Sequence, residues 1–215
     1  MIYERKIALV HVYGLDKNDP NRSNARGRRQ IKSAEILYQR GIIDGIVVTG
    51  GTIYTGKPGL ALVMKGEWYQ RGIIPSEKII VYPPPEGGAR STIDEIDLFK
   101  KASDEYALNN LASLASEMHI REIRDELNYV FKKKAQEIPV FSAEQIIAGL
   151  DPRFEHFIQR ALVSEDELAH RKQQAIKMKL RRLPFGRNML NFVAHYTPNK
   201  AAIQGRVLAG MQSGA

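Results

Sequence analysis

The chain has 215 residues, a formal net charge of +8 and no cysteine. Its length fits one ordinary domain with a sizeable core, and the lack of cysteine excludes disulfides, thiol nucleophiles and thiolate metal sites. The first residues are charged and no eighteen apolar residues follow one another, so neither a signal peptide nor a membrane-spanning helix is predicted. We expect a soluble, cytoplasmic protein.

Most of the positive charge lies in the C-terminal third. Residues 151–215 hold 11 Lys or Arg against 5 Asp or Glu. The basic run from Lys177 to Arg182 could contact nucleic acid or an anionic membrane surface, or it could be a solvated helix face. No aromatic residues are interleaved with it to stack on bases.

Strand and helix patterns alternate along the first two thirds of the chain. The predicted strands are 7–12, 46–49, 78–82, 111–115 and 138–141, and Pro139 places the last one at an edge. The predicted helices are one that ends at Gly41, followed by 58–70, 91–106 and 120–134. Residues from about Ala143 onward are expected to be helical.

Short connections between alternating strands and helices are typical of a parallel sheet covered by helices on both faces. We therefore predict a three-layer α/β/α, Rossmann-like domain at 1–142, with a mainly parallel sheet of about five strands. A basic helical extension at 143–215 packs on it or is appended to it. Such sheets bind ligands beyond the carboxyl ends of their strands, so the loops after Val12, Thr49, Tyr82 and Ala115 should share one crevice.

The loop from Gly51 to Lys57 matches the start of a phosphate-binding loop, with glycine, four residues, glycine and lysine. Pro58 stands where that loop needs Ser or Thr, and a residue before proline is disfavoured in the helical conformation. A nucleotide hydrolase that uses this loop is therefore the weakest of three hypotheses.

Several short motifs resemble the YdcF, SanA and ElyC family. They are Ala34-Glu35-Ile36-Leu37-Tyr38-Gln39-Arg40-Gly41, Thr49-Gly50-Gly51, Gly72-Ile73-Ile74-Pro75, Ser91-Thr92-Ile93-Asp94 and Ser116-Glu117-Met118-His119-Ile120-Arg121. The resemblance covers residues 7 to about 141. The chain departs from the family pattern at Gln30, where the family usually carries arginine, and at Leu60. The resemblance implies the same α/β fold and a ligand crevice, without a defined reaction.

Candidate ligand-binding residues come from three of the loops and the first helix. Arg26 and Gln30 are four residues apart and share one helical face; Arg26 is expected to point toward the crevice, and Gln30 to offer a neutral donor. Gly50 and Gly51 either allow a ligand to approach the backbone or simply form a tight turn.

The helix start at Ser91, Thr92 and Asp94 carries two possible capping boxes, Ser91 with Asp94 and Thr92 with Glu95, and could also receive an anionic group.

The loop after the fourth strand supplies Ser116, His119 and Arg121. His119 is the candidate catalytic residue, since histidine titrates near neutral pH and can act as acid or base, but it could equally be a helix-start histidine. His11 is expected to line the core or the crevice wall. The other histidines have no metal-ligand spacing, and the identity of any cofactor is unknown from the sequence.

These patterns lead to two main hypotheses. The first is a YdcF/SanA-like protein that holds a small anionic or nucleotide-like ligand, such as an S-adenosylmethionine-like molecule or an envelope-precursor phosphate, at the strand ends. The second is a non-catalytic adaptor or nucleic-acid-binding protein that acts through its basic helical C-terminus. The sequence does not decide whether turnover occurs, nor the oligomeric state.

Overall fold

The computed structural model describes residues 6–51, 58–83, 88–89 and 91–150, together with Phe154, Glu155, Ile158, Leu183, Phe185, Arg187 and Asn188. Five parallel strands form one sheet in the order β3-β2-β1-β4-β5. The strands are β1 (Lys6–Val10), β2 (Ile43–Val48), β3 (Ile79–Val81), β4 (Leu111–Ala115) and β5 (Val140–Ser142). The α/β fold expected from the sequence is confirmed.

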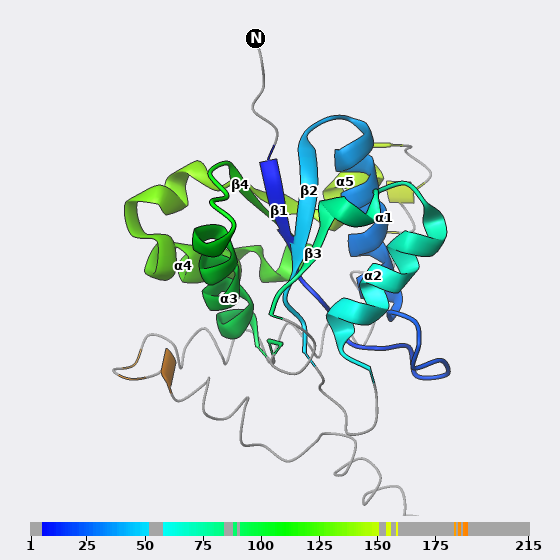
Figure 1. Cartoon of the computed structure of the whole chain (residues 1–215), viewed down its shortest axis with the longest axis horizontal. Helices are drawn as coiled ribbons and strands as arrows, with labels where there is room; N and C mark the ends of the chain where they lie inside the picture. The colour runs from blue at the N-terminus through cyan, green and yellow to red at the C-terminus, as the bar shows by residue number, and fades with distance from the viewer. Residues whose placement is uncertain are drawn as a thin grey trace, which may run out of the picture.

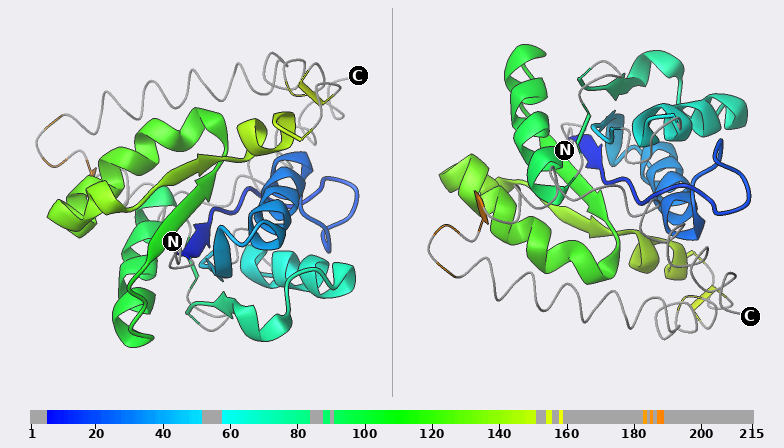
Figure 2. Two further views of the ribbon diagram at one scale, coloured as in Figure 1. Left: turned by 90° about the horizontal axis from the view of Figure 1, so that it is seen from above. Right: turned by 90° about the horizontal axis from the view of Figure 1, so that it is seen from below.

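Helices cover both faces of this sheet (Figure 1). The helices are α1 (Ala25–Gln39), α2 (Leu60–Arg71), α3 (Thr92–Glu105), α4 (Ile120–Phe131) and α5 (Ala143–Ala148). The first two and α5 lie on one face, and α3 and α4 lie on the other, as the end-on views in Figure 2 also show. The chain reverses its winding direction between β1 and β4, which are neighbours at the centre of the sheet.

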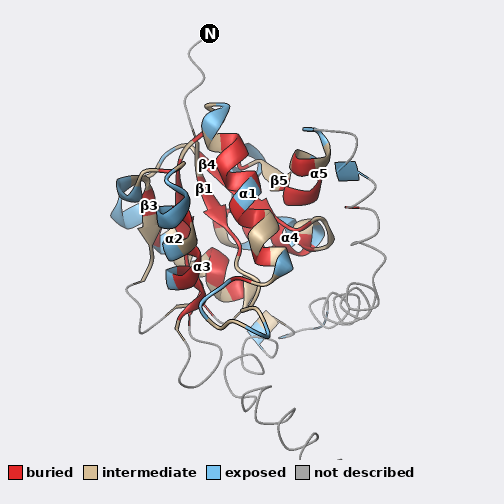
Figure 3. Ribbon diagram, turned by 90° about the vertical axis from the view of Figure 1, so that its right-hand side faces the viewer, coloured by how far each residue is buried: buried red, intermediate tan, exposed pale blue. Residues whose placement is uncertain are grey.

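The central strands are apolar on both faces because both faces are buried. In β1, Ala8 and Val10 pack under α1 and α2, whereas Leu9 packs under α3 and α4. Trp68 of α2 is fully buried in the first of these cores, and its indole N–H donates to the Ile31 carbonyl over 3.3 Å. Figure 3 shows buried residues in the strands and on the inward sides of the helices.

Polar caps fix the helix starts. Asn24, Ser91 and Ser142 each accept a hydrogen bond from a backbone amide in the first turn of α1, α3 and α5. Gly72 ends α2 with a φ of 65°, the left-handed conformation that glycine adopts without strain. At α3, therefore, Ser91 is the cap and the Asp94 amide is its partner.

Several predicted boundaries differ from the observed ones. β1 ends at Val10 instead of residue 12, β2 begins at Ile43 instead of residue 46, and β5 begins at Val140 instead of residue 138. The third strand begins at Ile79, because residues Ser76–Lys78 form a 3-10 turn. The helix predicted over 120–134 ends at Phe131, since Lys132 has a φ of 53° and the chain continues as a 3-10 helix over Lys132–Glu137. β5 lies at the sheet edge, as Pro139 indicated.

Beyond β5, α5 packs on α1, and Ile147 of α5 joins Ile36 and Ile158 in a small apolar cluster. Arg187 is attached to α3 and α4: it donates to Asp97 over 2.8 Å and to Glu126 over 2.5 Å. The basic run from Lys177 to Arg182 lies outside the described residues. Over the described part of the chain, no helix has the length and apolar character needed to cross a bilayer.

Candidate functional site

The carboxyl ends of β1 and β4 bring together polar residues from four distant segments. This is the position at which the winding direction of the sheet reverses, and where open parallel sheets hold their ligands. The residues directly after β1 face α3 on one side of the sheet and α1 on the other. We call this region the crevice, after the ligand crevice that the sequence predicts there.

On the α3 side, His11 and Glu95 form a buried pair. His11 Nδ1 lies 2.6 Å from Glu95 Oε2, and His11 Nε2 lies 3.0 Å from the Ser113 hydroxyl. The Val12 amide donates to the other Glu95 oxygen over 3.0 Å. These bonds attach the first turn of α3 to the end of β1, so His11 is a crevice-wall residue, as expected.

On the α1 side, Tyr13 lies between two cation-capable groups. The Arg26 guanidinium carbon is 5.6 Å from the centre of the Tyr13 ring, and the His119 ring centre is 5.1 Å from it. The Ser116 amide donates to the Tyr13 hydroxyl oxygen over 3.1 Å. Burial, reinforced by Glu95 and Glu144, raises the pKa of Tyr13 well above its usual value of 10.0, although the Ser116 hydrogen bond and Arg26 oppose this. Tyr13 is therefore a neutral phenol at physiological pH.

Glu144 joins α5 to the crevice. Its carboxylate accepts from Arg29 Nε of α1 over 3.1 Å and from the Glu117 amide over 2.8 Å. The side chain is 2% exposed. This carboxylate fixes the turn after β4 relative to α1, and so sets the position of Ser116 and His119.

His119 lies in the short 3-10 turn Glu117–His119 that precedes α4. Its Nδ1 is 3.2 Å from Glu122 Oε2, and both side chains are buried. A carboxylate at this nitrogen fixes the orientation of the imidazole. The structure thus places the candidate catalytic residue beside Tyr13, with a carboxylate behind it.

The two glycines after β2 have a packing role. A Cβ at Gly50 would clash with the side chain of Val12, and a Cβ at Gly51 would clash with the backbone of Gly88. Gly51 also donates its amide to Ala89 over 2.8 Å. The space beside these two glycines is therefore occupied by the chain's own atoms, those of Val12 and Gly88, and not left open for a ligand.

Thr49, just before these glycines, is 1% exposed, and its hydroxyl has no hydrogen-bond partner among the described residues. It follows Val47 by two positions and so faces the α3 side of the sheet. Its hydroxyl is an unused buried group at the edge of the crevice.

The remaining predicted residues separate into two groups. Ser91, Thr92 and Asp94 form the start of α3, where Ser91 is the cap. Gln30 is fully buried within α1, and Arg121 is exposed on α4. The structure brings together Arg26, Ser116 and His119.

Sequence reasoning missed Tyr13, Glu144 and the pairing of Glu95 with His11. The only local signal for Tyr13 was its position shortly after the first strand. The roles of Glu144 and of the Glu95–His11 pair depend on contacts between segments that are distant in the sequence. No group of three or more His, Asp or Glu side chains in the described ranges could hold a metal ion. The loop from 52 to 57, with Lys57, lies outside the described residues.

Comparison with protein-family models, with curated proteins and with solved structures found no match in any of the three. By its fold, the chain is a three-layer, Rossmann-like α/β protein with an all-parallel sheet.

Proposed function

We propose that this is a YdcF/SanA-like protein that binds a small anionic or nucleotide-like ligand in the crevice at the ends of β1 and β4. The observation that supports this best is the grouping of Tyr13, Arg26 and His119, which come from three separate segments. The ligand class includes an S-adenosylmethionine-like molecule and an envelope-precursor phosphate. A cytoplasmic location is part of the proposal.

The chemistry of these three side chains suits a ligand with a planar part and an anionic part. An aromatic ring offers a face for stacking, and a guanidinium engages phosphate or carboxylate in a defined orientation. The buried carboxylates nearby are already engaged. Glu95 is bonded to His11 and Val12, and Glu144 to Arg29 and Glu117.

His119 is the proposed proton-transferring group if the ligand is a substrate. Its imidazole has Glu122 at one ring nitrogen, an arrangement that lets a histidine gain or release a proton at the other nitrogen. Tyr13, kept neutral by burial, would hold a hydrogen bond rather than accept a proton.

Thermal unfolding tests this proposal, since a ligand that binds only the native state raises the unfolding midpoint. The wild type, Arg26→Gln and His119→Ala are measured with S-adenosylmethionine, nucleotides, sugar phosphates and polyprenyl phosphate analogues. We expect at least one compound to raise the midpoint of the wild type, and each variant to lose most of that increase relative to its own ligand-free midpoint.

Arg40→Gln is the matched control. Arg40 is an exposed arginine at the opposite end of α1 from Arg26, so its variant should keep the whole increase. If no compound raises the midpoint, or if Arg26→Gln responds as the wild type does, the crevice is not the binding site.

A second proposal is supported by the charge distribution. Residues 151–215 carry 11 Lys or Arg against 5 Asp or Glu, so the protein could instead be a nucleic-acid-binding adaptor. Binding through phosphate contacts would weaken steeply between low and moderate salt. Absence of nucleic-acid binding at low salt would exclude this second function.

A further inference from the structure

A cavity of about 520 Å³ lies away from the crevice, between the β1–α1 loop and the outer side of α2. Its lining includes Arg22 and Arg28 from the loop side, and Gly66, Glu67 and Arg71 from α2. None of the ligand-binding residues predicted from the sequence lines it. A volume of this size is within the range of small-molecule sites.

The loop over the cavity has a defined structure. The Ser23 amide donates to Glu67 Oε1 over 2.5 Å, which attaches the loop to α2. Within the loop, the Asp16 amide donates to the Arg22 carbonyl over 2.8 Å, and Leu15 and Ser23 form an antiparallel bridge. The β1–α1 loop and α2 therefore form the two walls of the cavity and are attached to each other.

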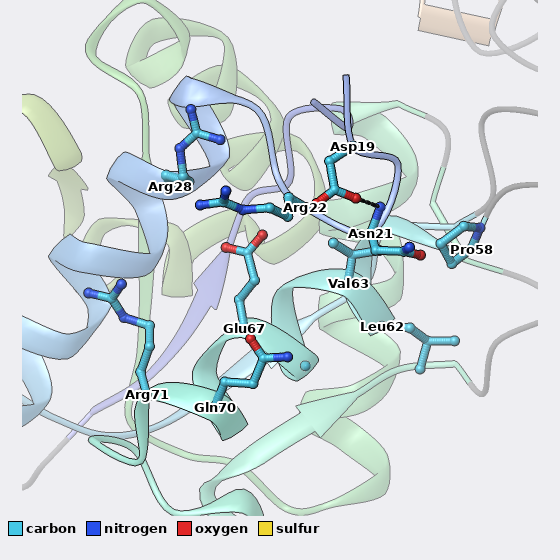
Figure 4. A pocket seen from close by; sticks show the side chains of 11 residues that line it. Asp19, Asn21, Arg22, Arg28, Pro58, Leu62, Val63, Glu67, Gln70 and Arg71 are labelled. Atoms are coloured by element: carbon cyan, nitrogen blue, oxygen red, sulfur yellow. Dashed lines mark hydrogen bonds between the residues drawn. The ribbon is translucent and has the colours of Figure 1, made fainter. Parts of the chain in front are cut away.

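Three arginines, Arg22, Arg28 and Arg71, line the cavity, and Figure 4 shows the Arg22 guanidinium beside the Glu67 carboxylate. Arg71 is held from behind through its Nε and one terminal nitrogen by Glu35, which is fully buried. Arg28 donates through one terminal nitrogen to Asp16, over 2.9 Å, and to the Ser23 carbonyl, over 2.8 Å. Each guanidinium thus has a fixed orientation and keeps N–H groups without a bond to a described residue, as a preorganised anion site requires.

Arg22 is exposed, its charge helps to lower the pKa of Asp16, and the Glu67 carboxylate points toward it in Figure 4. The two acids of the lining each already accept a backbone amide, Glu67 from Ser23 and Asp19 from Asn21. The guanidinium donors therefore outnumber the acceptors that remain.

The other end of the cavity is apolar and contains an unfilled space. Pro58, Leu62 and Val63 line it, and Leu62 is 38% exposed. Gly66 is exposed in the middle of α2, where glycine is unfavourable, and a Cβ there would meet no atom of the described residues within 4 Å. No contact within the described part of the chain requires a glycine here, so the surface above this turn of α2 is open.

From these features we infer that this cavity is a second ligand site, for a small organic molecule with a doubly charged anionic head and a compact apolar body. The head, a phosphate monoester or a pair of carboxylates, lies among Arg22, Arg28 and Arg71. The body lies over Gly66 against Pro58 and Leu62. This site is independent of the crevice.

Isothermal titration at low ionic strength tests the inference with three probes: phenyl phosphate, phthalate and inorganic phosphate. Phenyl phosphate binding more tightly than phthalate would identify a phosphate head, and the reverse order a dicarboxylate. Either should bind more tightly than inorganic phosphate, which lacks the apolar body. Arg22→Gln should weaken binding of the tighter probe about tenfold or more, because a charge-assisted contact is lost.

Gly66→Leu gives a test that does not remove charge. Its side chain should fill the space and weaken binding about tenfold, without lowering the unfolding midpoint, whereas Gly66→Ala should retain most of the binding. Arg40→Gln, at the far end of α1, should bind as the wild type does. Undetectable binding of all three probes, or unchanged binding by both Arg22→Gln and Gly66→Leu, would overturn the inference.

Discussion

The crevice and the cavity under the β1–α1 loop use charged side chains in opposite ways. In the crevice, Glu95 and Glu144 are buried and each accepts hydrogen bonds from two partners. In the cavity, Arg28 and Arg71 are 40% and 44% exposed, and only part of each guanidinium is bonded. Buried, satisfied groups hold segments in place, while oriented groups with spare donors are available to a ligand. In the crevice, the buried carboxylates hold the surrounding segments in fixed positions. In the cavity, the partly bonded guanidinium groups have N–H donors that a ligand can use.

Of the substitutions considered, removing the Glu95 carboxylate should lower the free energy of unfolding the most. Glu95→Ala leaves His11 Nδ1 and the Val12 amide without their partner in a buried site, which we expect to cost about 3 kcal/mol of unfolding free energy. Urea denaturation measures this. Asp104→Ala is the control on the same helix, because its ion pair with Lys100 is exposed and should contribute less than about 0.5 kcal/mol. Equal losses in the two variants would contradict a structural role for the His11–Glu95 pair.

Substituting Gly51 tests whether the turn after β2 is closely packed. Gly51→Ala should lower the unfolding free energy by about 2 kcal/mol, because the new Cβ meets the Gly88 backbone. The measurement is again urea denaturation. A neutral effect would mean that this turn has room for a side chain, and would return Gly51 to the list of residues that a ligand could approach.

Tyr13→Phe tests the role of the Tyr13 hydroxyl. At pH 7 we expect a loss of about 1 kcal/mol, since the Ser116 amide loses its acceptor. The pKa of Tyr13 is raised in the folded state, so the unfolded chain loses this proton first as the pH rises. The stability linked to Tyr13 is therefore fully present below about pH 10 and is lost as the pH rises through the folded-state pKa. Stability measured from pH 9 to 11 should fall less steeply in the variant; parallel curves would contradict this assignment.

Gly66→Ala should have the smallest effect, with the opposite sign. Its Cβ enters open space, and alanine is favoured over glycine in a helix interior, so the unfolding free energy should rise by up to about 1 kcal/mol. A rise in the thermal midpoint checks this. A fall would show that the space above α2 is occupied in the native protein.

The sequence predicted the fold because its strands are apolar runs and its helices carry local signals. The run from Ile46 to Thr49 and the cap at Ser91 are examples that need no knowledge of distant residues. The sheet edge at β5 followed from Pro139 in the same way.

The site was less accessible from the sequence. Glu95 stood out only as a possible capping partner of Thr92, whereas its partner is His11, 84 residues away. Glu144 acts on Arg29 across 115 residues. Such pairs depend on the order of strands in the sheet, which the alternation of strands and helices leaves open. The arginine cavity was missed for the same reason, because Arg71 and Arg28 meet only when α1 packs beside α2.

The most direct test of the crevice is amide chemical-shift mapping by NMR, with the compound that raises the unfolding midpoint. It is done in the Gly66→Leu variant, so that the cavity on α2 is filled. We expect the amides of Tyr13, Ser116 and His119 to shift with a single binding curve. Shifts that leave these three amides unmoved and lie elsewhere would contradict ligand binding at the ends of β1 and β4.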